Sequence, residues 1–302
     1  MLTRRSLVRS ARVLCIGTAA TLVPIALAPA ASAATLPVAC SETALRNAID
    51  TANGTPVSDT LNLAPGCTYR LNTELPAITT PIVINGNSAT ITRQSGTFRI
   101  LTVNGGALTA RAVILSDGDA TGSSVATGAG GAVVVTGNGS LNLNAAVIRN
   151  NHANFGGGVS VFNGSRAQIN ASVFTGNSAS VNGGGLVSDS TVTVNASQFR
   201  ANTAGNVGGG IANIGTLTVG ASNIVNNTAP NGGGGLANGV PAASGGTSTL
   251  TASNISNNSS GGTNPGGIYN NDGTVNLRAS RVAANTPSNC LNSPSPVPGC
   301  IG

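Results

Sequence analysis

Apolar and polar residues alternate in short stretches along most of the chain, and these stretches recur at a nearly constant interval. The segment 216–227 shows the pattern, with Leu217 and Val219 apolar and Thr218 polar between them. Alternation with a period of two residues predicts a short β-strand that buries one face and exposes the other. We therefore expect many short strands rather than helices over most of the sequence.

Clusters of two or three glycines followed by an apolar residue mark the repeat, and they lie at 156–158, 183–185, 208–210, 233–235 and 266–267, with a weaker copy at 130–131. From Val159 onward the apolar residues that follow are 27, 25, 25 and 32 residues apart. The longest step contains the segment 240–246, which we interpret as a loop insertion. Glycine at these places predicts a turn and strand entry where a positive φ or a close backbone approach excludes a Cβ atom.

A second motif keeps the same interval and consists of an apolar residue, two further residues and an asparagine. Small residues, Ala or Ser, come shortly before each copy. We expect each asparagine to lie at a bend and to bond its equivalents in the neighbouring turns, which forms a ladder of stacked amides. The predicted ladder consists of Asn150, Asn177, Asn202, Asn227, Asn258 and Asn285.

Self-similarity at 25 to 27 residues is the signature of a solenoid. Three short strands joined by turns fit this length, so we predict an all-β, right-handed parallel β-helix in which successive turns stack about 4.7–4.9 Å apart. Leucine-rich repeats share the period and the ladder, but here Ser or Ala replaces their central leucine. Calcium-binding nonapeptide solenoids need an Asp shortly after the glycines, where this chain has Val, Leu or Ile.

The glycine and asparagine motifs together resemble the repeats of polymorphic outer membrane proteins. Phe174–Asn177 and Phe199–Asn202 match the second motif of that family outright, and the other copies carry Val or Ile in place of Phe. The resemblance covers about residues 130–286. It implies a pectin lyase-like β-helix displayed outside the cell, as in the chlamydial surface adhesins and autotransporters. The Pro-rich segment after residue 286 does not resemble the strand series with which those proteins transport themselves.

The N-terminal part predicts a cap. Ser41 can N-cap a helix that runs to about Asn53 and presents Leu45 and Ile49 on one face. Such a helix can cover the open end of a β-helix. The segments 45–49 and 59–71 resemble the cap of secreted β-helix proteins that begin Cys-Ser-Leu-Arg-Glu-Ala, with three extra residues after Cys40-Ser41.

The first 33 residues have the features of an export signal: basic Arg4 and Arg5, an apolar stretch, and a small-x-small cleavage site at 31–33. Both the general secretory route and the twin-arginine route fit, and we expect a secreted or cell-surface protein. The chain then divides into a cleaved signal (1–33), an N-terminal cap (34–75), the parallel β-helix (76–286) and a Pro-rich C-terminal cap or tail (287–302).

The amino-acid composition narrows the range of folds and functions that the chain can have. Charged residues make up 7% and aromatic residues 2% of the chain, with 42 Gly and no Trp, which excludes an ordinary helical bundle. Removing the signal leaves ten Arg against eight acidic residues, a net charge of +2. No basic stripe for nucleic acid is present, and no membrane anchor is expected in the mature chain.

Four cysteines remain in the mature chain, in two pairs near its two ends: Cys40, Cys67, Cys290 and Cys300. An oxidising compartment favours bridges 40–67 and 290–300, although four cysteines allow three connectivities.

Candidate catalytic residues are few. Asp117 and Asp119 are the only close pair of carboxylates, and a D-x-D in a Gly-rich turn is more often turn chemistry than catalysis. The single histidine, His152, has no carboxylate in its own repeat to orient it. We expect neither a cofactor nor a metal ion.

The expected function is a secreted, non-catalytic solenoid for extracellular structure, adhesion or glycan binding. Its partner would be an extracellular glycan, a cell-wall polymer or a cell-surface protein. The alternatives are a polysaccharide lyase or glycoside hydrolase, which needs converging carboxylates, and an inert structural scaffold.

Overall fold

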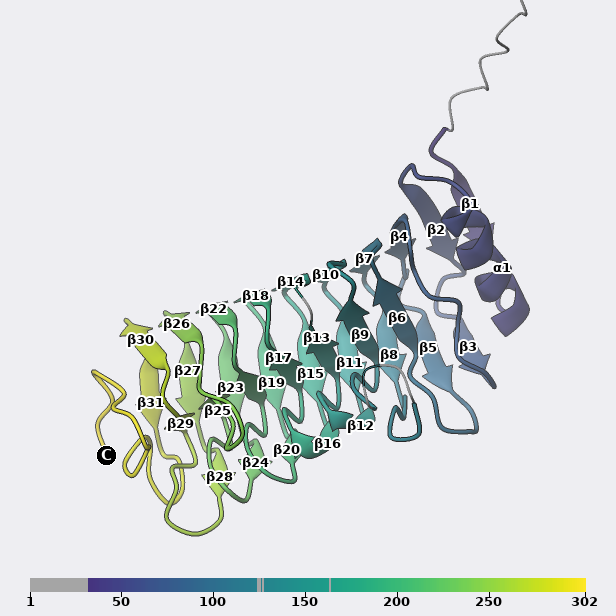
Figure 1. Ribbon diagram of the computed structural model, residues 1–302. Helices are drawn as coiled ribbons and strands as arrows, with labels where there is room; N and C mark the ends of the chain where they lie inside the picture. The colour runs from purple at the N-terminus through teal and green to yellow at the C-terminus, as the bar shows by residue number, and fades with distance from the viewer. Residues whose placement is uncertain (1–31, 124–125, 127, 163) are drawn as a thin grey trace, which may run out of the picture. The chain divides into compact units, whose positions relative to one another are not determined.

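The computed structural model describes residues 32–123, 126, 128–162 and 164–302. Within these residues the chain is a parallel β-solenoid with one α-helix, α1 (Glu42–Asn53), at its N-terminal end (Figure 1). The prediction of an all-β parallel solenoid with an N-terminal helix is confirmed. The expected export signal falls almost entirely on residues 1–31, which lie outside the described residues.

Four sheets run along the described solenoid, and every ladder between their strands is parallel. We name them sheets A to D. Sheet A contains β1 (Thr35–Val38), β2 (Asp59–Leu63), β4 (Pro81–Asn85), β7 (Ala107–Arg111), β10 (Ser140–Asn144), β14 (Arg166–Asn170), β18 (Thr191–Asn195), β22 (Thr216–Gly220), β26 (Thr247–Thr251) and β30 (Thr274–Arg278). Sheet B contains β3 (Thr68–Leu71), β5 (Thr90–Arg93), β8 (Ile114–Ser116), β11 (Val147–Arg149), β15 (Val173–Thr175), β19 (Gln198–Arg200), β23 (Asn223–Val225), β27 (Asn254–Ser256) and β31 (Arg281–Ala283).

The two remaining sheets close each turn. Sheet C contains β6 (Leu101–Asn104), β9 (Val133–Thr136), β13 (Val159–Val161), β17 (Leu186–Ser188), β21 (Ile211–Asn213), β25 (Leu236–Asn238) and β29 (Ile268–Asn270). Sheet D is a set of short strands between sheets B and C: β12 (His152–Phe155), β16 (Ser178–Asn182), β20 (Thr203–Ala204), β24 (Thr228–Ala229) and β28 (Ser259–Ser260). A full turn therefore runs through sheets A, B, D and C in that order.

Equivalent residues of successive turns lie directly above one another. Phe174 pairs with Phe199, and Phe199 pairs with Ile224. All three side chains are fully buried, and the two rings stack with centroids 4.4 Å apart. A large apolar side chain buried in this way contributes about 1.5–3 kcal/mol, so the interior column stabilises each turn against its neighbours.

The glycine clusters lie at the corner between sheets D and C, as predicted. Gly183 has a φ of +71°, a region that favours glycine. A Cβ atom on Gly185 would lie 2.6 Å from the carbonyl oxygen of Gly210 in the next turn. Positive φ and close backbone approach thus both act within one cluster.

Helix α1 covers the first turn. Ser41 accepts a hydrogen bond from the N–H of Ala44 at 3.1 Å, and Leu45 and Ile49 are completely buried. The disulfide Cys40–Cys67 joins the start of the helix to the turn before β3.

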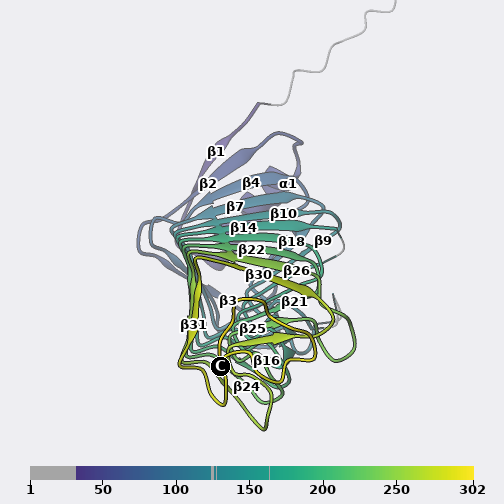
Figure 2. The same cartoon turned by 90° about the vertical axis from the view of Figure 1, so that its left-hand side faces the viewer.

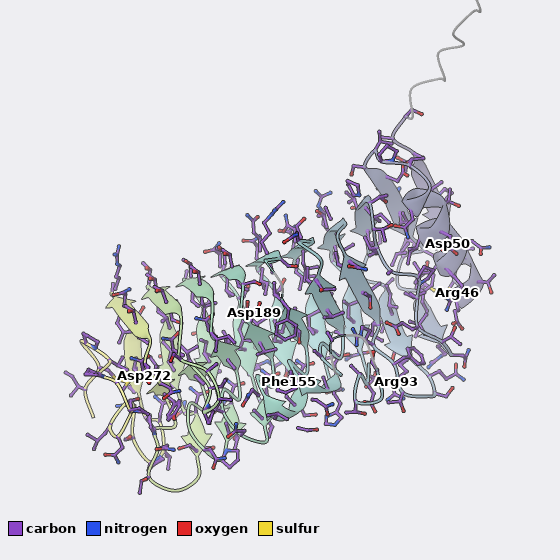
Figure 3. All side chains as sticks on the ribbon, viewed as in Figure 1. Arg46, Asp50, Arg93, Phe155, Asp189 and Asp272 are labelled. Atoms are coloured by element: carbon purple, nitrogen blue, oxygen red, sulfur yellow. A yellow bond between two sulfur atoms is a disulfide. The ribbon has the colours of Figure 1, made fainter. Side chains whose placement is uncertain are left out.

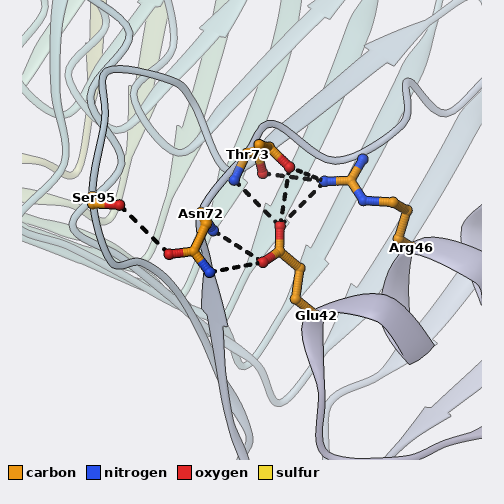
Figure 4. A network of polar contacts seen from close by, with 5 residues as sticks. All are labelled: Glu42, Arg46, Asn72, Thr73 and Ser95. Atoms are coloured by element: carbon orange, nitrogen blue, oxygen red, sulfur yellow. Dashed lines mark hydrogen bonds and ion pairs between the residues drawn. The ribbon is translucent and has the colours of Figure 1, made fainter.

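A polar network fixes the outer side of this helix (Figure 4). The carboxylate of Glu42 accepts hydrogen bonds from the backbone N–H groups of Asn72 and Thr73 at 3.1 and 3.2 Å. Arg46, one helical turn later, lies 3.3 Å from the same carboxylate and donates to the Thr73 hydroxyl at 2.6 Å.

The C-terminal segment packs on the last turn. The N–H of Ile268 bonds the carbonyl of Asn289, and the N–H of Ser295 bonds the carbonyl of Asn270. Val297 belongs to the buried core, and the disulfide Cys290–Cys300 closes the segment. Both disulfide pairings that the sequence favours are present.

Candidate functional site

An asparagine ladder runs along the corner between sheets B and D, but its first member differs from the prediction. Asn151 is completely buried and donates to the side-chain oxygen of Asn177 at 2.9 Å. Asn150 is exposed, has a φ of 55° and forms the corner itself. The assignment of Asn150 to the ladder is therefore wrong. The remaining predicted members, Asn177, Asn202, Asn227, Asn258 and Asn285, are linked one to the next by side-chain bonds of 2.9–3.0 Å.

The serines among the small residues noted before each motif form a second ladder at the corner between sheets A and B. The hydroxyl of Ser197 accepts from the N–H of Ser172 at 3.0 Å and donates to the carbonyl of Asn195 at 2.7 Å. The same pattern continues through Ser222, Ser253 and Ser280. Both ladders satisfy buried backbone groups, so they are structural and not sites for a ligand.

A groove on the outer face of sheet C is the strongest candidate for a binding site. The middle residue of each strand points outward, and Val187 in β17 forms the apolar floor of the groove. Ala212 in β21 and Ala237 in β25 are completely buried, and Tyr269 of β29 is 8% exposed. These residues form a hydrophobic cluster separate from the solenoid interior.

Two walls rise beside this floor. Phe155 and Asn182 end strands β12 and β16 and form one wall, and Phe162 and Ile214, which directly follow β13 and β21, lie on the other. Together with Val187 and Val240 they enclose a cavity of about 230 Å³. Phe155 and Phe162 are only partly buried, so two aromatic side chains are accessible to a ligand in the groove.

Amides form the rim of the groove. The side chain of Asn206 donates to Asn182 at 3.0 Å, and that of Asn231 donates to Asn206 at 2.9 Å. Asn206 is partly buried and Asn231 is exposed, so this shorter ladder presents polar atoms to solvent along the direction of the rod. An apolar cavity with aromatic walls and with amides at its edge can hold a ligand that has both apolar and hydroxyl-bearing faces.

The weak catalytic candidates Asp117 and Asp119 have separate partners. The carboxylate of Asp117 accepts from the hydroxyl of Thr92 at 3.0 Å. That of Asp119 accepts from the N–H and the hydroxyl of Thr121 at 3.1 and 2.7 Å, which is the turn chemistry expected of an Asp in a Gly-rich turn.

His152 has a neighbour that the sequence did not indicate. Its Nδ1 lies 2.7 Å from the hydroxyl oxygen of Ser178, one turn further along sheet D. Asp119 lies in register with His152 one turn earlier. An acid, an imidazole and a hydroxyl therefore follow one another in a column across three turns, although no hydrogen bond joins Asp119 to His152 among the described residues.

Apart from the ion pairs Glu42–Arg46 and Glu74–Arg99, the charged side chains are dispersed. Figure 3 shows Arg46 and Asp50 near helix α1, Asp189 about midway along the solenoid and Asp272 near its C-terminal end. The described residues contain no group of three or more His, Cys, Asp or Glu side chains that could hold a metal ion. In the described part of the chain, no helix has the length and apolarity that a membrane span requires.

The sequence reasoning missed the groove. Phe155 directly precedes a glycine triplet and Phe162 directly follows the next strand, so the segment 155–162 carries an aromatic residue at both ends. Both positions lie outside the pattern of alternating apolar and polar residues, and that pattern identifies only side chains in the solenoid interior. The signal for the groove in the sequence is the pair of aromatic residues on either side of strand β13.

The fold and the covalent links define a class: a parallel β-solenoid with a helix at its N-terminal end and a disulfide near each end of the described chain. Disulfides are typical of proteins in oxidising compartments, so the structure is compatible with an extracellular protein. A scan of the sequence against protein-family profiles and a search of curated proteins both found no match.

Proposed function

We propose that this protein is an extracellular, non-catalytic repeat protein that binds an extended glycan along the groove of sheet C. The observation that carries the proposal is the groove itself, in which Phe155 and Phe162 line a cavity with Val187 as its floor and Asn182 at its rim. Sugar rings have apolar faces that pack on aromatic rings and hydroxyls that bond amides.

The rim of the groove favours a ligand that extends along the rod. The side-chain amides of Asn182, Asn206 and Asn231 bond one another through three successive turns. A linear chain of sugars that lies along the rod therefore meets an amide in each of these turns, and its apolar face packs in the single cavity beside Val187. The lining residues include no carboxylate, and a glycosidase requires two carboxylates beside the bond that it cleaves.

The finer assignments belong to the same proposal. We infer that the repeats are of the polymorphic outer membrane protein type and that the fold is a right-handed, pectin lyase-like β-helix. The export signal at 1–33 delivers the chain to the outside of the cell, by the secretory or the twin-arginine route. The two disulfides support this localisation.

Binding to a panel of soluble glycans, measured by affinity electrophoresis and calorimetry, tests the proposal. We expect Phe162→Ala to weaken binding about tenfold or more, equivalent to about 1.4 kcal/mol. The matched control is Thr203→Ala, an exposed side chain on sheet D. Both variants should keep the wild-type melting temperature to within a few degrees, because neither side chain lies in the solenoid interior.

Two results would contradict the proposal. Equal binding by wild type and Phe162→Ala would place the glycan elsewhere. Release of sugar products by the wild type, lost in His152→Ala and Asp119→Asn, would favour the alternative of a hydrolase or lyase, because His152 contacts Ser178 and Asp119 lies in register with His152.

A further inference from the structure

The outer face of sheet A carries a regular array of threonines. Thr191, Thr216, Thr247 and Thr274 pair with one another in register across four consecutive strands. Two residues further along the strands, Thr193, Thr218 and Thr249 form a second row. We call these seven residues the threonine face.

The spacing of the array follows from sheet geometry. Neighbouring strands lie about 4.7–4.9 Å apart, and residues two apart on one strand are separated by about 6.4–6.8 Å. Strands β18, β22 and β26 carry six of the seven threonines, and seen along the rod they follow one another with little rotation (Figure 2). The threonine face is therefore close to a flat, two-dimensional lattice.

The hydroxyl groups of this face are available to solvent. Thr191, Thr216, Thr218, Thr247 and Thr274 are exposed, and Thr193 and Thr249 are partly exposed. All seven threonines belong to the described residues, and of these seven only Thr249 has a side-chain hydrogen bond within the described chain, a 3.5 Å contact from the amide of Asn276. Threonine is also stiff at χ1, so each methyl and hydroxyl group has a restricted position.

The array is uncharged and is not a general feature of the outer surface. The exposed positions of β18, β22 and β26 carry no charged residue, and the nearest charges on this sheet are Arg166 in β14 and Arg278 in β30. The equivalent outward positions of sheet B are mixed, with Gln198, Asn223 and Asn254 in successive turns. Folding of the solenoid therefore does not by itself require threonine at an outward position.

The regular, uncharged threonine face excludes two common classes of ligand. A nucleic acid or another polyanion needs basic side chains, which the threonine face lacks. A protein partner is held by buried aromatic or Arg anchors at the centre of the interface, and here every side chain is small and polar. What remains is a surface that matches a neutral lattice of hydrogen-bonding groups.

We propose that the threonine face binds crystalline water. The oxygen atoms of ice lie in rows with two repeats of sizes comparable to those of the array. Each hydroxyl donates and accepts hydrogen bonds, and each methyl group orders the water next to it. Water held in this way at fixed positions on a flat, uncharged surface can continue the lattice of an ice crystal, which anchors the protein to the ice and hinders further growth.

Adsorption to ice tests this proposal directly. The full-length protein with its disulfides intact is labelled with a fluorophore and incubated with a single growing ice crystal, and ice shaping and inhibition of recrystallisation are recorded. We expect the wild type to adsorb and to slow recrystallisation. Thr218→Lys places a strongly hydrated charge at the centre of the array and should abolish both effects.

Thr203→Lys is the matched control, since Thr203 is equally exposed but lies on sheet D. It should adsorb like the wild type, and so should Phe162→Ala, which alters only the groove. Melting temperatures of all variants should agree with that of the wild type, which separates loss of binding from loss of folding.

Three outcomes overturn the proposal. The wild type fails to adsorb to ice, or Thr218→Lys and Thr203→Lys lose adsorption equally. The third is adsorption to microcrystalline cellulose or chitin, but not to ice, that Thr218→Lys abolishes; the lattice recognised would then be a crystalline polysaccharide.

Discussion

At the scale of single residues, Asn202 shows why the ladder position accepts asparagine. Its side-chain nitrogen donates to Asn227 and to the carbonyl of Phe174 at 2.9 and 3.1 Å. Its side-chain oxygen accepts from the backbone and the side chain of Asn177 at 3.0 and 2.9 Å. Aspartate would lack the donors and bury a charge, and serine would be too short for all four bonds. The side-chain amide of Asn202 is completely buried, and both its oxygen and its nitrogen have hydrogen-bond partners.

Asn202→Ala should destabilise the protein by a few kcal/mol. The substitution removes the acceptor of the buried Asn177 backbone N–H and the side-chain donor to the Phe174 carbonyl, whereas Asn227 still accepts from the backbone N–H of residue 202. Each buried group that loses its partner costs about 1–3 kcal/mol. Urea unfolding measures the loss. The control is Asn223→Ala, an exposed side chain of the same sheet region that should change stability by less than about 0.5 kcal/mol. Similar losses in both variants would mean that the ladder adds nothing beyond the solvent-facing amides.

The corners next to the ladders hold alanines in the left-handed region. Ala196, which precedes Ser197, has a φ of 47°, and Ala171 and Ala221 repeat this one turn away on either side. A non-glycine residue pays about 1–2 kcal/mol for this conformation. The serine ladder and the stacked sheets hold it in place.

Ala196→Val should therefore be more damaging than its small change in volume suggests, since a β-branched side chain in the left-handed region is a genuine outlier. We expect a loss of about 1–3 kcal/mol, whereas Ala196→Gly should be neutral or slightly stabilising. Thermal unfolding of the two variants checks this ordering. A glycine variant less stable than the valine variant would show that backbone conformation is not the controlling factor.

At the scale of elements, helix α1 is attached to the solenoid through the charged form of Glu42. Burial raises the pKa of this carboxyl, but hydrogen bonds from the backbone and side chain of Asn72, from Thr73 and from Arg46 outweigh that effect and lower the pKa below its usual value. The folded state therefore prefers the ionised carboxylate, and proton binding weakens the attachment of the cap.

The contribution of Glu42 to stability is complete above its unfolded-state pKa of about 4.3. It is lost as the pH falls below that value and through the lower folded-state pKa. We expect the difference in stability between wild type and Glu42→Gln to shrink steadily when unfolding is measured from pH 6 down to pH 3. Asp50→Asn, on the exposed side of the helix, is the control for the loss of a carboxylate from this helix. A constant difference across this range would mean that the carboxylate charge is irrelevant to the cap.

At the scale of the whole molecule, the sequence predicted what repeats and missed what occurs once. Interior residues such as Phe174 and ladder residues such as Asn202 face equivalent surroundings in every turn, so the period alone located them. The ladder was misplaced by one residue at Asn150 because that turn contains two consecutive asparagines and two consecutive apolar residues, and the motif fits both registers.

The groove is harder to predict because its walls come mostly from non-equivalent positions in several turns. Phe155 ends a strand, and Val240 comes from a turn further along the chain. Phe162 and Ile214 do occupy equivalent positions, but they lie two turns apart and Asp189 takes that position in the turn between them. Only the stacking distance between turns brings them around one cavity.

Each turn of the solenoid contacts only its neighbours, so stability should be lost from the ends. The disulfide Cys40–Cys67 closes a segment of 27 residues and holds α1 over the first turn. Replacing both cysteines by serine should cost about 2–4 kcal/mol, and the cost should fall on the N-terminal turns. Hydrogen exchange followed by mass spectrometry measures this: we expect faster exchange in β2 and β4 and unchanged protection in β18 and β22. The equivalent Cys290→Ser/Cys300→Ser variant should instead release β29. Faster exchange in every turn of either variant would show that the solenoid unfolds as a single cooperative unit, because only global coupling carries the loss of one cap to the far end.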